Sequence, residues 1–432
     1  METQNSPLRL HFLRRMHKVF YIPFLALLGP GLIAAAAGND AGGIATYSII
    51  GAHFGYSLLW LMAPLTIGLI IIQEMSARLG VVTGKGFSDL IRENYSIQTT
   101  VFLMFLLTIA NASLVISEFA GIAASFELFG ISKYITVPVS AALIWWMIVK
   151  GTYPKAEKLF ILMSALLISY VPAAILAHPN WIHITGELMR PSLPGTITQM
   201  SAAVALLGTT ISPYMQLFAQ SSVVEKGITI SHYHDEKIDT LVGVLFSNLI
   251  AIFIIIAAAE TLFPAQIHVD SAQTAALALV PFAGNAAKTL FSAGFLGASL
   301  LAAGILPLTT AFALCNAFGW ESGVNRSLSE APVFYAIFTF LIVLSATIVL
   351  SPAISLIELL YKLQILNALI LPVELFYMVK LINNHQLMGR YVNGKIYNFF
   401  VWLTVLIIGA VSVVYLGGAT MSFAVKLLDI RL

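Results

Sequence analysis

The chain has 432 residues, of which 59% are hydrophobic and only 10% are charged, and its mean hydropathy is +0.90. Soluble domains carry roughly 25% charged residues, so this composition excludes a soluble protein and predicts an integral protein of the lipid bilayer. The net charge of +2 predicts no nucleic-acid partner, and the single cysteine, Cys315, excludes an internal disulfide.

The apolar segments predict an all-α membrane protein, because a membrane-spanning helix needs about 20 apolar residues. Short polar linkers separate the segments, so we expect one transmembrane transport domain over residues 1–432 and no soluble domain. The eleven predicted spans are residues 20–50, 56–80, 99–126, 134–150, 157–177, 196–223, 239–263, 286–316, 332–350, 354–381 and 396–417.

The distribution of Lys and Arg predicts the orientation of the spans. With a cytoplasmic amino terminus, 16 of the 22 Lys and Arg residues fall in cytoplasmic linkers or in the adjoining span ends. Such an excess is typical of the cytoplasmic side of a membrane protein. An odd number of spans then places the carboxyl terminus outside. We expect the protein to lie in a bacterial inner (plasma) membrane. The charge pattern carries no information on its oligomeric state.

The first and sixth spans are interrupted in similar ways. Span one contains Gly38, Gly42 and Gly43, and each glycine weakens a helix by about 1 kcal/mol relative to alanine. Span six contains Pro213, which has no backbone N–H and disrupts a helix. Interruptions five spans apart are typical of two inverted repeats with a substrate site near the midplane. The repeats would cover residues 20–177 and 196–381, and an extra helix residues 396–417.

Asp40 is the most unusual residue of span one. A carboxylate at mid-membrane costs roughly 2.5–3.5 kcal/mol, and spans one and six contain no Lys or Arg to balance it. Unwound backbone near Gly43, with oxygens of Thr209 and Ser212 from span six, would complete an all-oxygen cation site. Such ligands favour Mg²⁺, Ca²⁺, Mn²⁺ or Na⁺. The structural alternative is a carboxylate that caps a half-helix.

Other polar residues of the spans have two interpretations each. Glu118 in span three either relays protons and lines the cation path, or forms a hydrogen bond between helices. Glu74 and Arg78 are spaced as an i,i+4 ion pair, which predicts a structural contact. Gln364 and Asn367 in span ten form a polar patch, which either joins helices or contacts the ion path.

Three motifs are distinctive: Gly29-Pro30-Gly31 ahead of Asp40, Ala77-Arg78-Leu79-Gly80-Val81-Val82-Thr83-Gly84-Lys85 after span two, and Leu387-Met388-Gly389 after span ten. In this order, and along nearly the whole chain, they resemble the natural resistance-associated macrophage protein (Nramp) family. The resemblance implies a LeuT-type fold, with two inverted five-helix repeats and an eleventh helix. It implies divalent metal ions as transported substrates, no enzymatic activity and no cofactor.

The chain departs from this family at the residues that bind metal. The family's metal ligands are an Asp and an Asn of span one and an Ala and a Met of span six. Carried over, the Asp is Asp40, while Gly43, Thr209 and Ser212 replace the other three. Without the thioether, the pattern resembles the Nramp-related magnesium transporters, whose site is expected to be wider, to accept a hydrated ion and to lack proton coupling.

Three further residues are implied to lie beside the metal or on its path. Glu118 matches a glutamate of the family's proton path, whereas Tyr214 replaces a histidine linked to proton movement. Gln364 is the third, from the polar patch of span ten.

We therefore expect a secondary transporter that imports Mg²⁺, and Mn²⁺ as well, without proton coupling. The alternatives are a proton-coupled Mn²⁺/Fe²⁺ transporter, an amino-acid transporter of the same fold, and a metal sensor that does not transport. Asp40 would repel the substrate carboxylate of an amino acid, which argues against the amino-acid transporter. The sequence shows no soluble signalling domain, which argues against the sensor.

Overall fold

The computed structural model describes residues 39–151 and 153–429. Within these residues the regular structure is entirely helical. The inner part of predicted span one, with Gly29-Pro30-Gly31, Gly38 and the basic amino terminus, lies outside the described residues.

The helices follow the predicted spans closely. The first half of the chain forms α4 (Ala41–Phe54), α5 (Met62–Thr83), α6 (Phe87–Asn94), α7 (Ile97–Glu127), α8 (Lys133–Val149), α9 (Tyr153–Ser164), α10 (Tyr170–Leu176) and α11 (Trp181–Leu188). The second half forms α12 (Ile197–Thr210), α13 (Pro213–Glu225), α14 (Tyr233–Thr261), α15 (Ala272–Ala276), α16 (Val280–Ala283), α17 (Ala287–Phe318), α18 (Pro332–Val349), α19 (Leu356–Ile382), α20 (His385–Met388) and α21 (Lys395–Asp429).

The lengths and apolar composition of these elements are those of a membrane protein. Among the described residues, nine helical segments are long and apolar enough to cross a membrane. α8 is a tenth apolar helix, of 17 residues, at the lower limit for a span. α4 supplies the remaining part of predicted span one. The protein is therefore an integral membrane protein, as the composition predicted.

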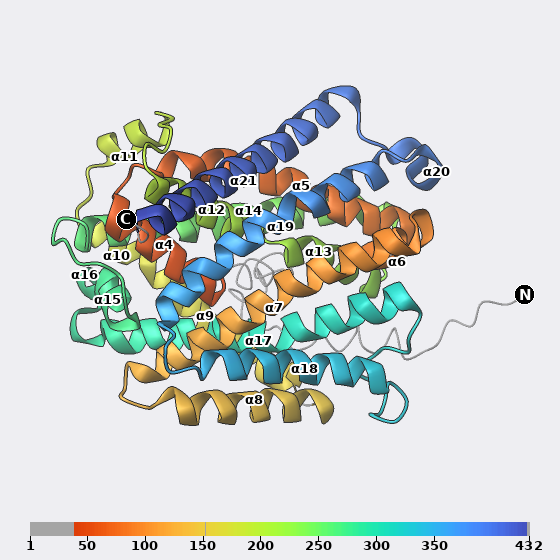
Figure 1. Ribbon diagram of the computed structural model, residues 1–432, viewed down its shortest axis with the longest axis horizontal. Helices are drawn as coiled ribbons and strands as arrows, with labels where there is room; N and C mark the ends of the chain where they lie inside the picture. Colours follow the sequence, from red (N-terminus) through yellow and green to blue (C-terminus); the bar gives the residue numbers. More distant parts are fainter. Residues whose placement is uncertain (1–38, 152, 430–432) are drawn as a thin grey trace, which may run out of the picture.

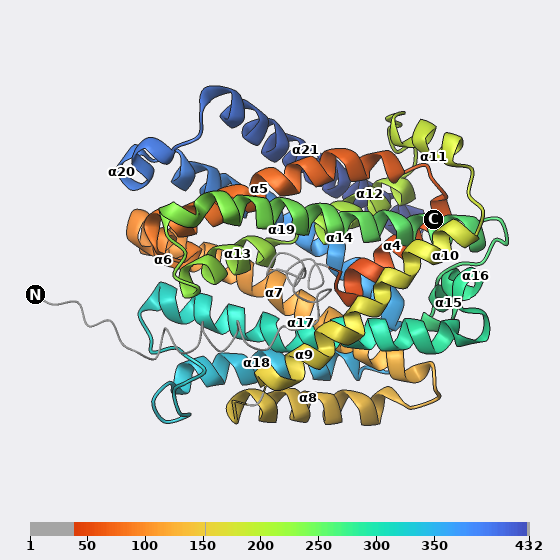
Figure 2. The same ribbon diagram turned by 180° about the vertical axis from the view of Figure 1, so that it is seen from behind.

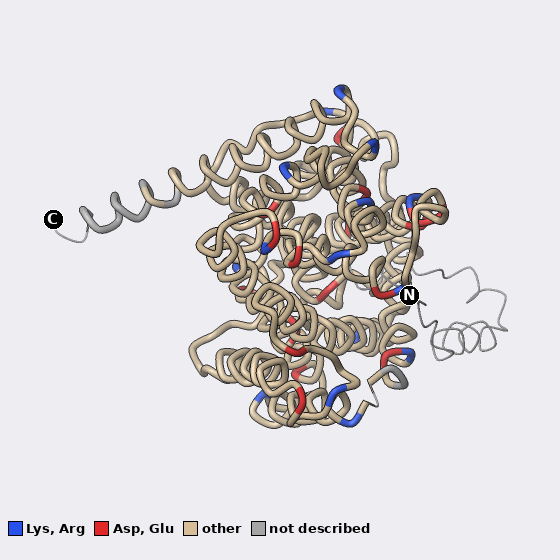
Figure 3. The backbone as a smooth tube through the Cα atoms, turned by 90° about the vertical axis from the view of Figure 1, so that its right-hand side faces the viewer, with Lys and Arg blue, Asp and Glu red and all other residues tan. Residues whose placement is uncertain are grey.

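The long helices run side by side, and the connections between them gather at two opposite ends (Figure 1). One end carries α6 and α20, and the other carries α11, α15 and α16. The view from behind shows the same division (Figure 2). It matches the alternation of linkers expected from the sequence, with α6 and α20 in linkers predicted to be cytoplasmic. Figure 3 is viewed from the end that carries α6 and α20, and Lys and Arg positions are spread across that end.

The centre of the molecule is built from the interrupted spans and the helices around them. α4 packs against α14, α12 packs against α19, and α7 packs against both α17 and α19. Every residue from Ala41 to Ala52 of α4 is buried. A helix that is buried on all sides needs no polar face, which explains why α4 is apolar around its circumference.

Glycines allow these central helices to approach closely. A Cβ atom on Gly208 of α12 would lie 1.9 Å from the Gln364 carbonyl oxygen of α19. A Cβ atom on Gly121 of α7 would lie 2.4 Å from the Cβ of Ala41 in α4. Small residues at helix contacts are typical of membrane proteins, where backbone proximity replaces the hydrophobic effect.

Candidate metal site

The interruption of span six lies where Pro213 predicted it. α12 ends at Thr210, Ile211 and Ser212 leave the helical conformation, and Pro213 is the first residue of α13. Proline is favoured there because its missing N–H has no helical partner in any case. The same missing N–H leaves the carbonyl oxygen of Thr209, four residues earlier, without its helical bond.

In the described part of predicted span one, Asn39 and Asp40 are not helical, and α4 begins at Ala41. Asp40 is its N-cap, in an extended conformation, and its Oδ1 atom accepts a hydrogen bond from the Gly43 N–H at 2.6 Å. The Asp40 carbonyl accepts from the Ile44 N–H at 3.0 Å. Gly43 therefore lies inside the first helical turn, whereas the sequence suggested unwound backbone near it; the non-helical residues described before α4 are Asn39 and Asp40. The capping role considered for Asp40 occupies one carboxylate oxygen only.

The start of α4 and the interruption of span six meet at Gly43. A Cβ atom on Gly43 would lie 3.0 Å from the Thr209 hydroxyl and 3.1 Å from Oδ1 of Asp40. Asp40 and Thr209 are buried, at 2% and 1% exposure. Three predicted ligand positions, from two distant parts of the chain, therefore share one place. The fourth, Ser212, is also buried, and its hydroxyl donates to the Gly208 carbonyl at 2.8 Å.

Glu118 and Gln364 reach the same place from α7 and α19. The Oε2 atom of Glu118 accepts a long hydrogen bond, 3.4 Å, from the N–H of Ala41, next to Asp40. A Cβ atom on Gly42 would lie 1.7 Å from Nε2 of Gln364 and 2.8 Å from the Ser117 hydroxyl. The absence of a side chain at Gly42 therefore makes room for both polar groups.

Tyr214 lies in the first turn of α13 and is buried. Its phenol is close enough to Asp40 and Glu118 for their charges to act on it. The structure thus places all three accompanying residues predicted from the sequence (Glu118, Tyr214 and Gln364) around Asp40.

Several buried polar atoms of this cluster have no hydrogen-bond partner within the described part of the chain. They are Asp40 Oδ2, Glu118 Oε1, Ser117 Oγ, Thr209 Oγ1, Thr210 Oγ1 and Gln364 Nε2. The two threonine hydroxyls lie beside the Tyr47 phenol without completing a hydrogen bond to it. Buried polar atoms are normally paired, and unpaired ones cost free energy in an apolar environment. Such a cluster is typical of a site that exists to hold a polar ligand.

The chemistry of the cluster favours a hard cation. Its oxygens come from carboxylates, hydroxyls and the carbonyl of Thr209, and the carboxyl end of α12 carries the negative pole of the helix dipole. Across residues 39–151 and 153–429, His, Cys, Asp and Glu form no group of three or more that could hold a metal ion. A site with so little formal charge suits a cation that keeps part of its water shell.

Sequence reasoning did not assign Ser117, Tyr47 or the close packing at Gly42 to this site. Tyr47 had a usable signal, because Asp40, Gly43 and Tyr47 are spaced i, i+3 and i+7 and so share one helix face. Ser117 was signalled only by its position next to Glu118. The contact at Gly42 depends on the packing of three helices and has no local signal.

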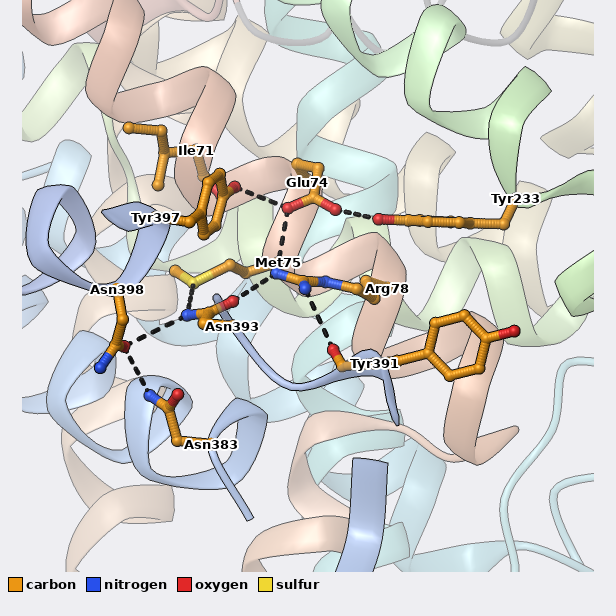
Figure 4. A network of polar contacts seen from close by, with 10 residues as sticks. All are labelled: Ile71, Glu74, Met75, Arg78, Tyr233, Asn383, Tyr391, Asn393, Tyr397 and Asn398. Atoms are coloured by element: carbon orange, nitrogen blue, oxygen red, sulfur yellow. Dashed lines mark hydrogen bonds and ion pairs between the residues drawn. The ribbon is translucent and has the colours of Figure 1, made fainter. Parts of the chain in front are cut away.

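A second buried polar cluster centres on Glu74 and Arg78 of α5 (Figure 4). The predicted i,i+4 ion pair is confirmed, with Arg78 Nη2 at 3.2 Å from Glu74 Oε2. The Tyr397 hydroxyl donates to Oε2 of Glu74 at 2.6 Å, and the Tyr233 hydroxyl donates to Oε1. Glu74 therefore links α5 to both α14 and α21.

Arg78 extends this cluster to the segment before α21 (Figure 4). It donates to the side-chain oxygen of Asn393 at 2.5 Å and to the carbonyl of Tyr391 at 3.0 Å. Asn393 in turn donates to Asn398, which also accepts from Asn383, the residue that follows α19, at 2.8 Å. We refer to the residues drawn in Figure 4 as the Glu74–Arg78 network.

Comparison with known proteins agrees with this architecture. Residues 31–417 match the family model described as "Natural resistance-associated macrophage protein-like". The manganese transporter of Eremococcus coleocola, crystallised with an aromatic bis-isothiourea compound, is similar, with a TM-score of 0.74 and 19% identity over 92% of this chain and 87% of that chain.

Two structures outside this family are also similar. MhsT in complex with L-phenylalanine gives a TM-score of 0.58 and 14% identity over 89% of this chain and 97% of that chain. Mhp1, a nucleobase-cation-symport-1 family transporter, gives a TM-score of 0.51 and 14% identity over 91% of this chain and 92% of that chain. At such identities the likenesses show the fold alone, which is the predicted LeuT-type fold.

Proposed function

Because the chain belongs to the natural resistance-associated macrophage protein family, we propose that it is a secondary transporter of divalent metal cations, with Mg²⁺ as its main substrate and Mn²⁺ as a second. It carries the cation into the cytoplasm by alternating access. The ion gradient and the membrane potential drive the movement without obligatory proton symport.

The observation that carries this proposal is the meeting of the start of α4 with the interruption of span six, at Asp40 and Thr209. The free Oδ2 of Asp40, the Thr209 hydroxyl and the Thr209 carbonyl are hard oxygen ligands within a buried cluster. The carboxylate of Asp40 attracts the cation, while the small number of protein ligands leaves room for water. Mg²⁺ gives up its water reluctantly, so such a site suits it better than a closed cage of protein ligands.

The preference for Mg²⁺ is supported by what stands at Gly43 and Ser212. Neither position has a side chain with an amide oxygen or a sulfur atom, and thioether ligands favour softer metals. Mn²⁺ also accepts oxygen ligands, which makes it a second substrate.

One observation favours a second candidate, a proton-coupled Mn²⁺/Fe²⁺ transporter. Glu118 contacts the first turn of α4 directly beside Asp40, so two carboxyl groups share the site. A pair of carboxyl groups is able to take up a proton as a cation leaves. In the main proposal Glu118 only adds negative charge to the path.

Uptake into proteoliposomes tests the proposal. The wild-type protein is expected to carry Mg²⁺, and Asp40→Asn is expected to abolish uptake, since asparagine keeps the helix cap but removes the charge. Asp270→Asn, at an exposed position, is the matched control and should transport normally. Mg²⁺ uptake at the wild-type rate in Asp40→Asn would contradict the site assignment. Acidification of the lumen in step with metal entry would establish the proton-coupled alternative instead.

A further inference from the structure

Glu374 is a buried acid of the predicted spans, and unlike Asp40, Glu74 and Glu118 it has no assigned role. It lies in α19 with 1% exposure, and neither of its carboxylate oxygens has a hydrogen-bond partner within the described residues. The ion pairs formed by the described part of the chain do not include it. An unpaired carboxylate inside a membrane protein is costly, and such residues commonly mark an ion path.

The helical repeat places Glu374 on the side of α19 that faces α7. Asn367 precedes it by seven residues, about two turns, with Pro372 between them, and both side chains are buried. The side-chain oxygen of Asn367 accepts a hydrogen bond from the Ser113 hydroxyl of α7 at 3.2 Å. Glu374 therefore lies about 10 Å beyond Asn367 along α19, toward the carboxyl end of that helix.

The opposite side of α19 is occupied by α21. The ring of Phe376 packs on Trp402 of α21 at 6.0 Å between centroids, and the Ser412 hydroxyl of α21 donates to the Ala368 carbonyl at 3.1 Å. Phe376 lies two residues beyond Glu374, so its side chain points in a different direction. Glu374 is thus turned away from α21 and toward the centre of the molecule.

A polar series on α19 leads from the Asp40 cluster to Asn367, and Glu374 lies two turns beyond it, past the apolar residues Ile370 and Leu371. Gln364 packs against Gly42, and the Asn367 amide donates to Gln364 at 3.4 Å. From Gln364 to Glu374 the helix advances by about 15 Å. The advance runs toward the end that carries α6 and α20 (Figure 1), which the distribution of Lys and Arg predicts to be cytoplasmic.

We propose that Glu374 is an inner binding position for the transported divalent cation, which the ion occupies after it leaves Asp40 and before it reaches the cytoplasm. This inference rests on the proposed function. A single carboxylate with water molecules holds a hydrated cation weakly, which suits a position on a release path. Conduction requires sites that attract the ion and yet let it leave, and two weak sites in succession meet that need.

The competing explanation is a neutral carboxylic acid that only fills space in the core. The two explanations differ in what leucine would do at this position. Leucine is similar in size and apolar, so in a purely structural role Glu374→Leu would keep transport and raise thermal stability. At a cation position, Glu374→Leu and Glu374→Gln would both slow transport.

Mg²⁺ uptake into proteoliposomes, with KM and kcat determined separately, decides between them. Glu374→Gln and Glu374→Leu are expected to lower kcat about tenfold with little change in KM, because capture at Asp40 is intact. Glu374→Asp keeps the charge and should retain most of the turnover. Glu358→Gln is the matched control, since Glu358 lies on the same helix in an exposed ion pair with Lys362. Its kinetics should equal those of the wild type.

The outcomes also separate this inference from the proposed function. If the wild type carries Mg²⁺ and Asp40→Asn does not, while Glu374→Gln and Glu374→Leu keep the wild-type kcat, the inner position is refuted and the transporter assignment stands. Equal loss of turnover in Glu374→Asp and Glu374→Gln would also refute it. If the wild type carries no Mg²⁺, the proposed function fails and the inner position fails with it.

Discussion

Two buried polar regions of this protein, the Glu74–Arg78 network and the cluster around Asp40, differ in how completely their polar atoms are paired. In the network, both oxygens of Glu74 accept hydrogen bonds, and Arg78 donates to three separate groups. In the Asp40 cluster, one oxygen of Asp40, one of Glu118 and the hydroxyl of Thr209 lack partners within the described residues.

The difference separates a structural role from a functional one. Paired charges join helices that are distant in the sequence, so the network stabilises one arrangement of α5, α14 and α21. Unpaired oxygens stabilise nothing in the protein itself, and they remain able to bind a cation. Composition alone does not distinguish the two regions, because each is centred on an acidic residue inside a predicted span.

Removing one partner from the network should give the largest change in stability. Arg78→Ala leaves Glu74 buried without its counter-charge, which is expected to lower the free energy of unfolding by about 3 kcal/mol. Thermal unfolding of the purified protein in detergent measures the effect.

The chain offers a matched control for Arg78→Ala. Glu358 and Lys362 form an ion pair with the same i,i+4 spacing, but their side chains are 60% and 65% exposed. Lys362→Ala should cost less than about 1 kcal/mol, because water screens exposed pairs. Equal losses in the two variants would contradict the distinction between the network and an ordinary surface pair.

The fold could be predicted from the sequence because its signals are local. Apolar segments of about 20 residues located the spans, and Pro213 located the interruption of span six within one helical turn. The start of α4 was predicted less well. Three glycines predicted where the helix weakens, but the side chain of Asp40 decides where α4 begins, by capping the N–H of Gly43.

Restoring the side chains that the Asp40 cluster lacks should change its selectivity. Gly43→Asn with Ser212→Met adds a side-chain amide oxygen and a thioether, and the atoms nearest to a Cβ on Gly43 would be the Thr209 hydroxyl, Oδ1 of Asp40 and a ring carbon of Tyr47, at 3.0, 3.1 and 3.4 Å. Within residues 39–151 and 153–429 the Thr209 hydroxyl has no hydrogen-bond partner that would keep it from moving aside. Sulfur favours Mn²⁺ over Mg²⁺, so the ratio of Mn²⁺ to Mg²⁺ uptake should rise about tenfold.

A competition assay with both metals in proteoliposomes measures that ratio. Ser222→Met, in α13 beyond the site, is the control for a methionine introduced elsewhere and should leave the ratio unchanged. An unchanged ratio in the double variant would mean that Gly43 and Ser212 do not face the cation.

The site was less predictable than the fold because it depends on contacts between distant segments. The sequence indicated Asp40 and Thr209 through the cost of a buried charge and the paired interruptions. It did not indicate that Gly42 leaves space for Gln364 and Ser117, since that requires α4, α7 and α19 to meet at one point. Glu374 was recognisable as a buried acid, but only the structure shows that it lacks a partner among the described residues.

The smallest predicted effect is also the most direct test of the comparison, because it concerns the sign of a change. Thr209→Val replaces an unpaired buried hydroxyl by a methyl group of the same size. Removing an unpaired polar group from the core is expected to raise the free energy of unfolding by up to about 1 kcal/mol. The same change removes a ligand, so the affinity for Mg²⁺ should fall about threefold.

Thr310→Val is the counterpart in which the hydroxyl is paired. Thr310 is equally buried, but its hydroxyl accepts from the Asn111 amide at 2.9 Å and donates to the Leu306 carbonyl. Valine there leaves Asn111 without that partner, and stability should fall by about 1 kcal/mol. Opposite signs in the two thermal shifts would show that the Thr209 hydroxyl is kept for a ligand at the expense of stability. Destabilisation of the same size in both variants would place Thr209 among the structural contacts.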